Sequence, residues 1–125
     1  MSNLYEKLNL SNEFNILRII CGAFFIPHIF GKYVEREFTL GFFTKAGFKP
    51  PELYIWIALI VETILAVALI LGIYTTIAGS LAAIHLAVAA GAVYRVSGGR
   101  WFWNLGGYEY CAFWLICCIV VAMHG

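Results

Sequence analysis

Four long runs of apolar residues, separated by shorter polar segments, dominate the chain. The runs span about residues 14–31, 53–72, 74–94 and 108–124. Each approaches the roughly 20 apolar residues that an α-helix needs to cross a bilayer, and the last is the shortest. Backbone N–H and C=O groups inside a bilayer must bond to one another, and an α-helix meets that requirement within one segment. The pattern predicts an all-α integral membrane protein, a four-helix bundle.

Local signals define the ends of these helices. Ser11 is a candidate N-cap for the first helix, with Glu13 in its first turn. Pro50 and Pro51 fix the start of the second helix, because proline is tolerated at the first helical position. Gly72 and Ile73 form a tight turn before the third helix. With no linker or internal repeat, residues 1–125 are predicted to form a single transmembrane domain.

Residues 32–52 alternate lysine and arginine with phenylalanine, which favours an amphipathic segment lying flat at the lipid headgroups, a helix followed by a loop. An even number of crossings places this segment and the loop 95–107 on the same side of the membrane. Together the two segments hold six of the eight Lys and Arg residues. Because lysine and arginine are enriched in cytoplasmic loops, both segments are predicted to be cytoplasmic.

Composition agrees with a lipid environment. The chain is 62% hydrophobic and 12% charged, whereas a soluble domain has about a quarter of its residues charged. A domain of this size buries only part of its surface, so the outer faces must contact the lipid bilayer. The net charge is +1, and no basic run is present, so nucleic acid is not expected as a partner.

Ionisable residues within the apolar runs are costly to insert and therefore need partners. At about 1.5 Å of rise per residue, Glu62 and His85 both lie about 13 Å from the side that carries the two longer loops. Because they lie on consecutive antiparallel helices, we predict an intramembrane pair between them. The alternatives are contacts with a partner subunit or a pairing of Glu62 with Arg18.

The first helix has a polar stripe at spacings of three and four residues, which places its members on one face. The stripe consists of Arg18, Cys21, Phe25, His28 and Lys32. This face is expected to look into the bundle or towards a partner. Arg18 is an additional intramembrane charge near the opposite side, where its side chain could extend to the interface.

A second candidate site combines the end of this stripe with the start of the fourth helix. His28 lies about 6 Å from the side that holds the loops, and Glu109 begins the fourth helix at that side. We expect His28, Lys32, Tyr108 and Glu109 to converge there, with Trp101 or Trp103 as walls. A simpler explanation for Glu109 is its favourable interaction with the helix dipole.

Haem and metal binding are not expected. A haem held by two histidines needs both imidazoles at a similar depth, and His28 and His85 differ by about 7 Å on this reckoning. His124 belongs to the far side. No helix has two histidines, or a glutamate and a histidine, at the spacing of a metal site, so no metal ligands are assigned.

Several segments, in order, resemble the DoxX family of small four-helix membrane proteins. Arg18, His28 and Lys32 are similar to charged positions of its first helix, and FTKAGFKPPE at residues 43–52 resembles a segment that follows. Glu62 with LILGIYT at residues 69–75 resembles the family's intramembrane glutamate and the run after it. GGYE at residues 106–109 is the most specific element. Tyr94 stands where family members often have a histidine.

The resemblance implies a redox setting, in what is expected to be a bacterial inner membrane. Family members include a subunit of a thiosulfate:quinone oxidoreductase and membrane components of oxidoreductase assemblies. The first hypothesis is an accessory subunit that packs against the other subunits of a larger membrane complex and stabilises it. The second is a quinone-binding subunit, using the site at His28 and Glu109, that receives electrons from another subunit. The third is a small-molecule transporter.

Overall fold

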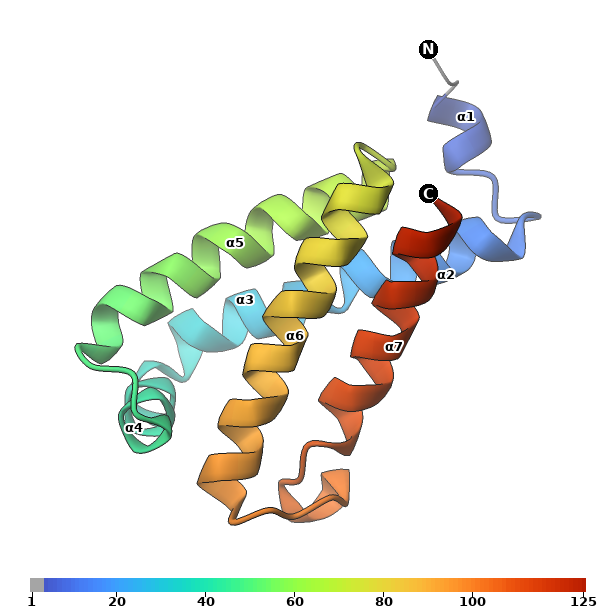
Figure 1. Cartoon of the computed structure of the whole chain (residues 1–125). Helices are drawn as coiled ribbons and strands as arrows, with labels where there is room; N and C mark the ends of the chain where they lie inside the picture. The colour runs from blue at the N-terminus through green and yellow to red at the C-terminus, as the bar shows by residue number, and fades with distance from the viewer. Residues whose placement is uncertain (1–3) are drawn as a thin grey trace.

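The computed structural model describes residues 4–125, which form helices with no strand among them. Figure 1 shows these helices packed side by side, with α1 and the C-terminal end of α7 at the same end of the molecule. In chain order they are α1 (Leu4–Lys7), α2 (Glu13–Ala23), α3 (Phe25–Val34), α4 (Arg36–Ala46), α5 (Pro51–Leu71), α6 (Thr75–Ser97), the short 3₁₀ helix η1 (Trp103–Leu105) and α7 (Glu109–His124).

The first apolar run forms two consecutive helices where the sequence pattern predicted one. The interruption falls at Phe24, between α2 and α3. Pro27 explains it, because proline has no N–H to donate to the carbonyl of Ala23 and its ring crowds that carbonyl. The N-cap also differs from the expected Ser11. Asn12 caps α2, and its Oδ1 accepts a hydrogen bond from the backbone N–H of Phe14 over 2.9 Å.

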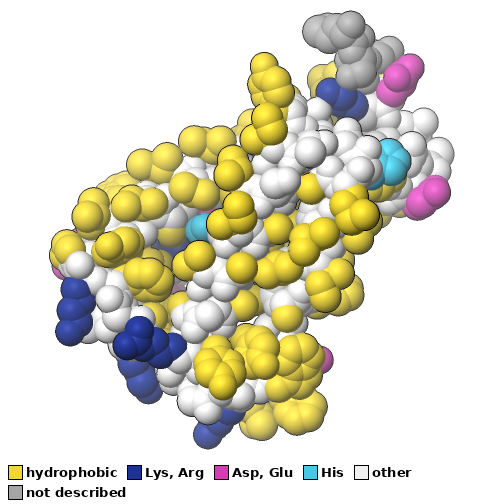
Figure 2. Space-filling model, viewed as in Figure 1, with side chains coloured by type: hydrophobic (Ala, Val, Ile, Leu, Met, Phe, Trp, Pro, Cys, Tyr) yellow, Lys and Arg dark blue, Asp and Glu magenta, His cyan; other side chains and the backbone are white. Residues whose placement is uncertain are grey.

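Three helical segments of the described chain are long and apolar enough to cross a membrane: Glu13–Val34, Pro51–Leu71 and Thr75–Ser97. The apolar helix Glu109–His124 is shorter. Large apolar side chains cover the outward faces, with Ile64 62% exposed on α5 and Ile84 61% exposed on α6. Figure 2 shows hydrophobic side chains over most of the visible surface of α5, α6 and α7. Lipid is the solvent that such a surface requires.

The helix α5 forms a hairpin with α6 and also packs against α2 and α3. A tight turn joins α5 to α6, where Gly72 adopts φ +73° and the N–H of Ile73 donates to the carbonyl of Ala68 over 2.8 Å. On its other side α5 packs against α2 and α3, while α6 packs along α7. Small residues permit these close approaches. A Cβ on Gly22 would lie 2.9 Å from Cβ of Leu69, and one on Gly79 would lie 2.9 Å from the backbone N of Ala122.

The core lies where α2, the start of α3, α5, α6 and α7 meet. Phe25, Leu69 and Cys118 are among its most completely buried side chains. Trp114 of α7 is also buried, and its Nε1 donates a hydrogen bond to the carbonyl of Cys21 over 3.1 Å. That bond ties the last helix to the first apolar run and fixes the indole beside α3.

Candidate functional site

A buried carboxylate on α5 forms the centre of the site. Glu62 is only 5% exposed, although it lies in the middle of an apolar helix. Its Oε1 and Oε2 accept hydrogen bonds from Nζ of Lys32 over 2.8 and 3.1 Å. Nε2 of His85 lies 2.8 Å from Oε2. We call Lys32, Glu62 and His85 the polar cluster.

The cluster draws on three helices that the fold brings together. Lys32 comes from α3, Glu62 from α5 and His85 from α6. One lysine and one carboxylate cancel in charge, and this pairing limits the cost of placing both groups in a medium of low dielectric constant. With Glu62 ionised, Nε2 of His85 must carry the proton in their contact. The cluster therefore places two donors, Lys32 and His85, on one carboxylate.

The polar cluster forms part of the wall of a cavity of about 550 Å³. Aromatic rings from α4 and the loop after it cover one side of this cavity: Phe38, Phe42, Phe43 and Phe48. Aliphatic residues of α5 and α6, among them Ile57 and Ala89, form much of the rest. The cavity is thus mostly apolar, with its charged groups gathered in one place.

His28 occupies another part of the same wall. Its imidazole packs on the ring of Trp114 with 5.3 Å between centroids, and lies 6.2 Å from that of Tyr110. Trp114 also lines the cavity. His28 is therefore held by aromatic contacts, one turn from Lys32 on the same helix.

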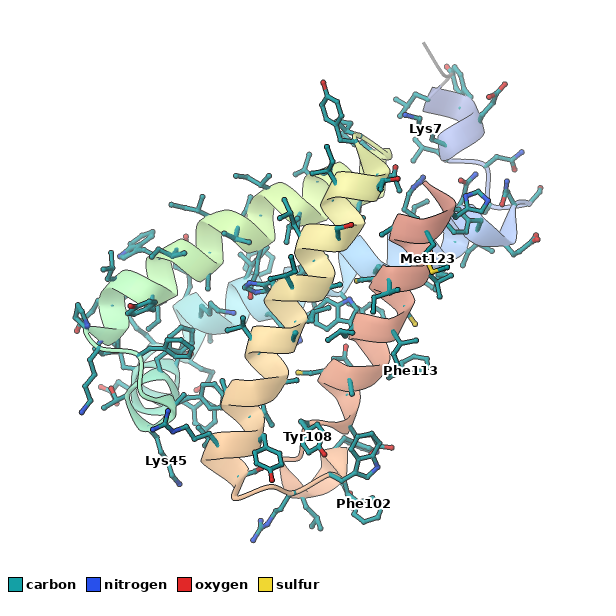
Figure 3. The ribbon with its side chains drawn as sticks, viewed as in Figure 1. Lys7, Lys45, Phe102, Tyr108, Phe113 and Met123 are labelled. Carbon is teal, nitrogen blue, oxygen red and sulfur yellow. The ribbon has the colours of Figure 1, made fainter. Side chains whose placement is uncertain are left out.

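The structure does not bring together the four residues that were expected to converge at His28 and Glu109. His28 and Lys32 line the cavity, whereas Tyr108 and Glu109 are not among the residues that line it. Tyr108 packs on Tyr94 and Trp101, with centroid distances of 5.4 and 5.1 Å. Figure 3 shows Tyr108 at the end of the molecule that holds the loop before α7.

Glu109 is bound to the loop 98–108 that precedes its helix. Oε1 of Glu109 accepts a hydrogen bond from the backbone N–H of Trp103 over 3.1 Å, so this carboxylate orders η1. Trp101 and Trp103, the expected walls of the site, are exposed and do not line the cavity. Lys32 pairs with Glu62 instead, because α3 continues to Val34 and packs against α5.

Glu62 and His85, predicted to lie at the same depth, are in contact in the structure. The third member of the cluster was missed, because Lys32 was assigned to the interface. Its spacing of four residues from His28 on an inward-facing stripe was a signal that could have found it. The contribution of α4 was also missed, since the phenylalanines of residues 36–48 were interpreted as facing lipid headgroups.

Arg18 lies at the other end of the molecule. Extension of its side chain to the interface was one possibility from the sequence, and in the structure Arg18 is only 3% exposed. The guanidinium donates through Nη1 and Nη2 to the carbonyl of Lys7, and Nζ of Lys7 donates to the carbonyl of Gly72 over 2.7 Å. Arg18 thus fastens α1 to α2, while Lys7 fastens α1 to the end of α5, and no hydrogen bond or ion pair joins Arg18 to Glu62.

The histidines are distributed over both ends of the molecule. His28 and His85 line the cavity, while His124 stacks on Phe14 with 3.5 Å between centroids. Among residues 4–125, no group of three or more His, Cys, Asp or Glu side chains is arranged to hold a metal ion.

Comparison with known proteins places the chain in a family. The model of the DoxX family matches residues 14–95, which include nearly all of α2 and α6, the whole of α3, α4 and α5, and the whole polar cluster. No curated protein and no solved structure matches the chain.

Proposed function

Because the chain belongs to the DoxX family of membrane proteins, we propose that it binds a lipid-soluble quinone in the cavity beside the polar cluster, as a subunit of a membrane redox complex. The observation on which this proposal depends is a charged cluster of Lys32, Glu62 and His85 in the wall of an otherwise apolar cavity.

The size and lining of the cavity support a ligand of this class. Sites for small organic molecules typically have volumes of about 300–1,000 Å³, apolar walls and a few convergent polar groups. The cavity falls in this range at about 550 Å³. Aromatic rings such as Phe43, Phe48 and Trp114 offer flat surfaces for a quinone ring to stack on.

The polar cluster supplies what a quinone head group requires. Quinone carbonyls accept hydrogen bonds, and Lys32 and His85 are donors that line the cavity. Reduction to the quinol consumes two electrons and two protons. In this proposal a partner subunit provides the two electrons, and two protons taken from water reach the quinone oxygens through the imidazoles of His85 and His28. Glu62 holds His85 in position and balances the charge of Lys32.

The arrangement in the membrane forms part of the proposal. We take α7 as a fourth crossing, because it is apolar between its ends and packs along α6. Its 16 residues span about 24 Å, a little less than a typical hydrocarbon core. The helix α4 then lies near the headgroups of the side rich in lysine and arginine, which the positive-inside rule makes cytoplasmic. An accessory subunit that only stabilises its complex is the competing proposal.

Titration with a short-chain quinone tests the function. The purified protein in mild detergent is titrated with decylubiquinone while tryptophan fluorescence is recorded, since Trp114 lines the cavity and a bound quinone quenches it. We expect saturable quenching, and at least tenfold weaker binding in Glu62→Gln and His85→Leu because each removes a member of the cluster.

Glu109→Gln is the matched control, because it alters a carboxylate outside the cavity and should leave affinity unchanged. Binding that weakens in Glu109→Gln and not in Glu62→Gln would move the site to the loop before α7. Absence of saturable binding, together with loss of a larger complex when the chain is deleted, would favour the accessory role.

A further inference from the structure

A second hollow lies at the opposite end of the molecule, where α1, α2, the α5–α6 turn and the end of α7 meet. It has a volume of about 120 Å³, more than one water molecule requires. Lys7, Arg18, Thr75 and His124 are among the residues that line it. Figure 3 shows Lys7 extending from α1 beside the α5–α6 turn, far from the end that holds Lys45 and Tyr108.

The hollow is lined by Lys7 and Arg18, and no Asp or Glu side chain is among its described lining residues. The side chain of Arg18 is buried, because the residue is only 3% exposed. Both ion pairs among the described residues involve Glu62 and neither involves Arg18. A buried guanidinium in a membrane protein normally has an anionic partner, because an uncompensated charge of low solvation is costly. The backbone carbonyl of Lys7 accepts hydrogen bonds from two nitrogens of Arg18, but a carbonyl carries no full negative charge.

Helix dipoles do not supply the missing negative charge. The C-terminus of α5 would favour cations, and Lys7 donates to its last carbonyl at Gly72. The N-terminus of α6 begins three residues later at Thr75 and brings a partial positive charge of similar size. The two effects largely cancel at this turn. The C-terminal end of α7, also beside the hollow, contributes about half a negative charge, so most of the positive charge of Lys7 and Arg18 remains.

The start of α6 adds donors that favour an anion. Its N-cap residue, Tyr74, makes no side-chain capping bond, so N–H groups of the first turn lack intrahelical partners. The hydroxyl of Thr75, which lines the hollow, is a further donor.

We infer that this hollow binds a phosphate group, held by Arg18 and Lys7 with help from the first turn of α6. Arg18 lies about 8 Å along the helix from Glu13, which places the hollow near the membrane interface where lipid phosphates lie. A lipid headgroup and a free phosphate share the chemistry that Arg18 and Lys7 recognise. This inference does not depend on quinone binding at the other end.

Two probes distinguish these sources. Native mass spectrometry of the detergent-solubilised full chain measures retention of added phosphatidylglycerol, and inorganic phosphate is then added as a competitor. We expect one lipid retained with saturable affinity, and at least fivefold weaker retention in Lys7→Gln and in Arg18→Gln. Displacement by millimolar inorganic phosphate identifies a site for the free anion, whereas retention in its presence identifies a lipid site.

Lys45→Gln is the control, because Lys45 is an exposed lysine at the opposite end and should retain the lipid as the unmodified chain does. Arg18→Gln also breaks the bond to α1, so Lys7→Gln and His124→Gln serve as the test if that variant does not fold. Equal retention by the control and by Lys7→Gln, or no saturable binding of either probe, would overturn the inference.

Discussion

At the scale of single residues, Glu62 is closely constrained by its neighbours. It is buried among apolar helices, and two neighbours donate to it over 2.8 Å each. Removing one member of a buried ion pair leaves an uncompensated charge, while replacing both members by neutral groups of similar size is often nearly neutral. The same residues therefore allow a test of stability that is separate from ligand binding.

We predict that Glu62→Gln lowers the free energy of unfolding by about 3 kcal/mol, because it leaves the ammonium of Lys32 buried without a counter-charge. Lys32→Met should have a similar cost. The double variant should unfold within about 1 kcal/mol of the unmodified chain. Denaturation in detergent micelles, followed by circular dichroism, measures all four proteins. Additive losses in the double variant would show that the two groups do not interact.

The residues that were predicted correctly and those that were missed differ for a physical reason. The depth of Glu62 and His85 follows from helix rise alone, since both belong to uninterrupted helices. Lys32 lies beyond the interruption at Phe24, where the direction of α3 depends on its packing against α5. A depth calculated for a straight helix includes neither that change of direction nor the length of the lysine side chain.

At the scale of helices, close packing depends on small residues at particular positions. Within α6, Gly79 faces α7, and a Cβ there would lie 2.9 Å from the backbone N of Ala122. Gly91 of the same helix has no atom within 4 Å of its would-be Cβ. The two glycines form a matched pair for testing the α6–α7 interface.

Gly79→Ala is predicted to lower stability by about 1–3 kcal/mol, because α6 and α7 must move apart to admit the methyl group. Gly91→Ala should leave stability unchanged or raise it by about 0.5–1 kcal/mol, since alanine favours a helix more than glycine does. Thermal unfolding in the same detergent compares them. Equal effects of the two substitutions would mean that α6 and α7 do not pack as described.

The helix boundaries show how well the pattern of apolar residues predicts where helices begin and end. The second, third and fourth runs, expected at residues 53–72, 74–94 and 108–124, begin and end within a few residues of α5, α6 and α7. The segment 32–52 does contain a helix and a loop. Its periodicity could not show that Phe38, Phe42 and Phe43 face the cavity, because a ring beside the headgroups and a ring against other helices give the same pattern.

At the scale of the whole molecule, the two ends differ in chemistry. The polar cluster and the larger cavity lie towards the end that holds α4, and Figure 2 shows most of the visible Lys and Arg side chains at that end. The buried Arg18 and the smaller hollow lie at the end that holds α1. The two proposed ligands, a quinone and a phosphate group, would therefore bind at opposite ends of the molecule, each beside charged side chains that the fold buries.

If the space beside Lys32, Glu62 and His85 holds the proposed quinone, a bulky side chain that fills this space should exclude it. Ala89 of α6 lines the cavity, whereas Ala87 of the same helix is exposed and does not. Decylubiquinone affinity of Ala89→Phe and Ala87→Phe is measured by tryptophan quenching. We expect at least tenfold weaker binding in Ala89→Phe and unchanged binding in Ala87→Phe. Equal affinity in both variants would contradict it.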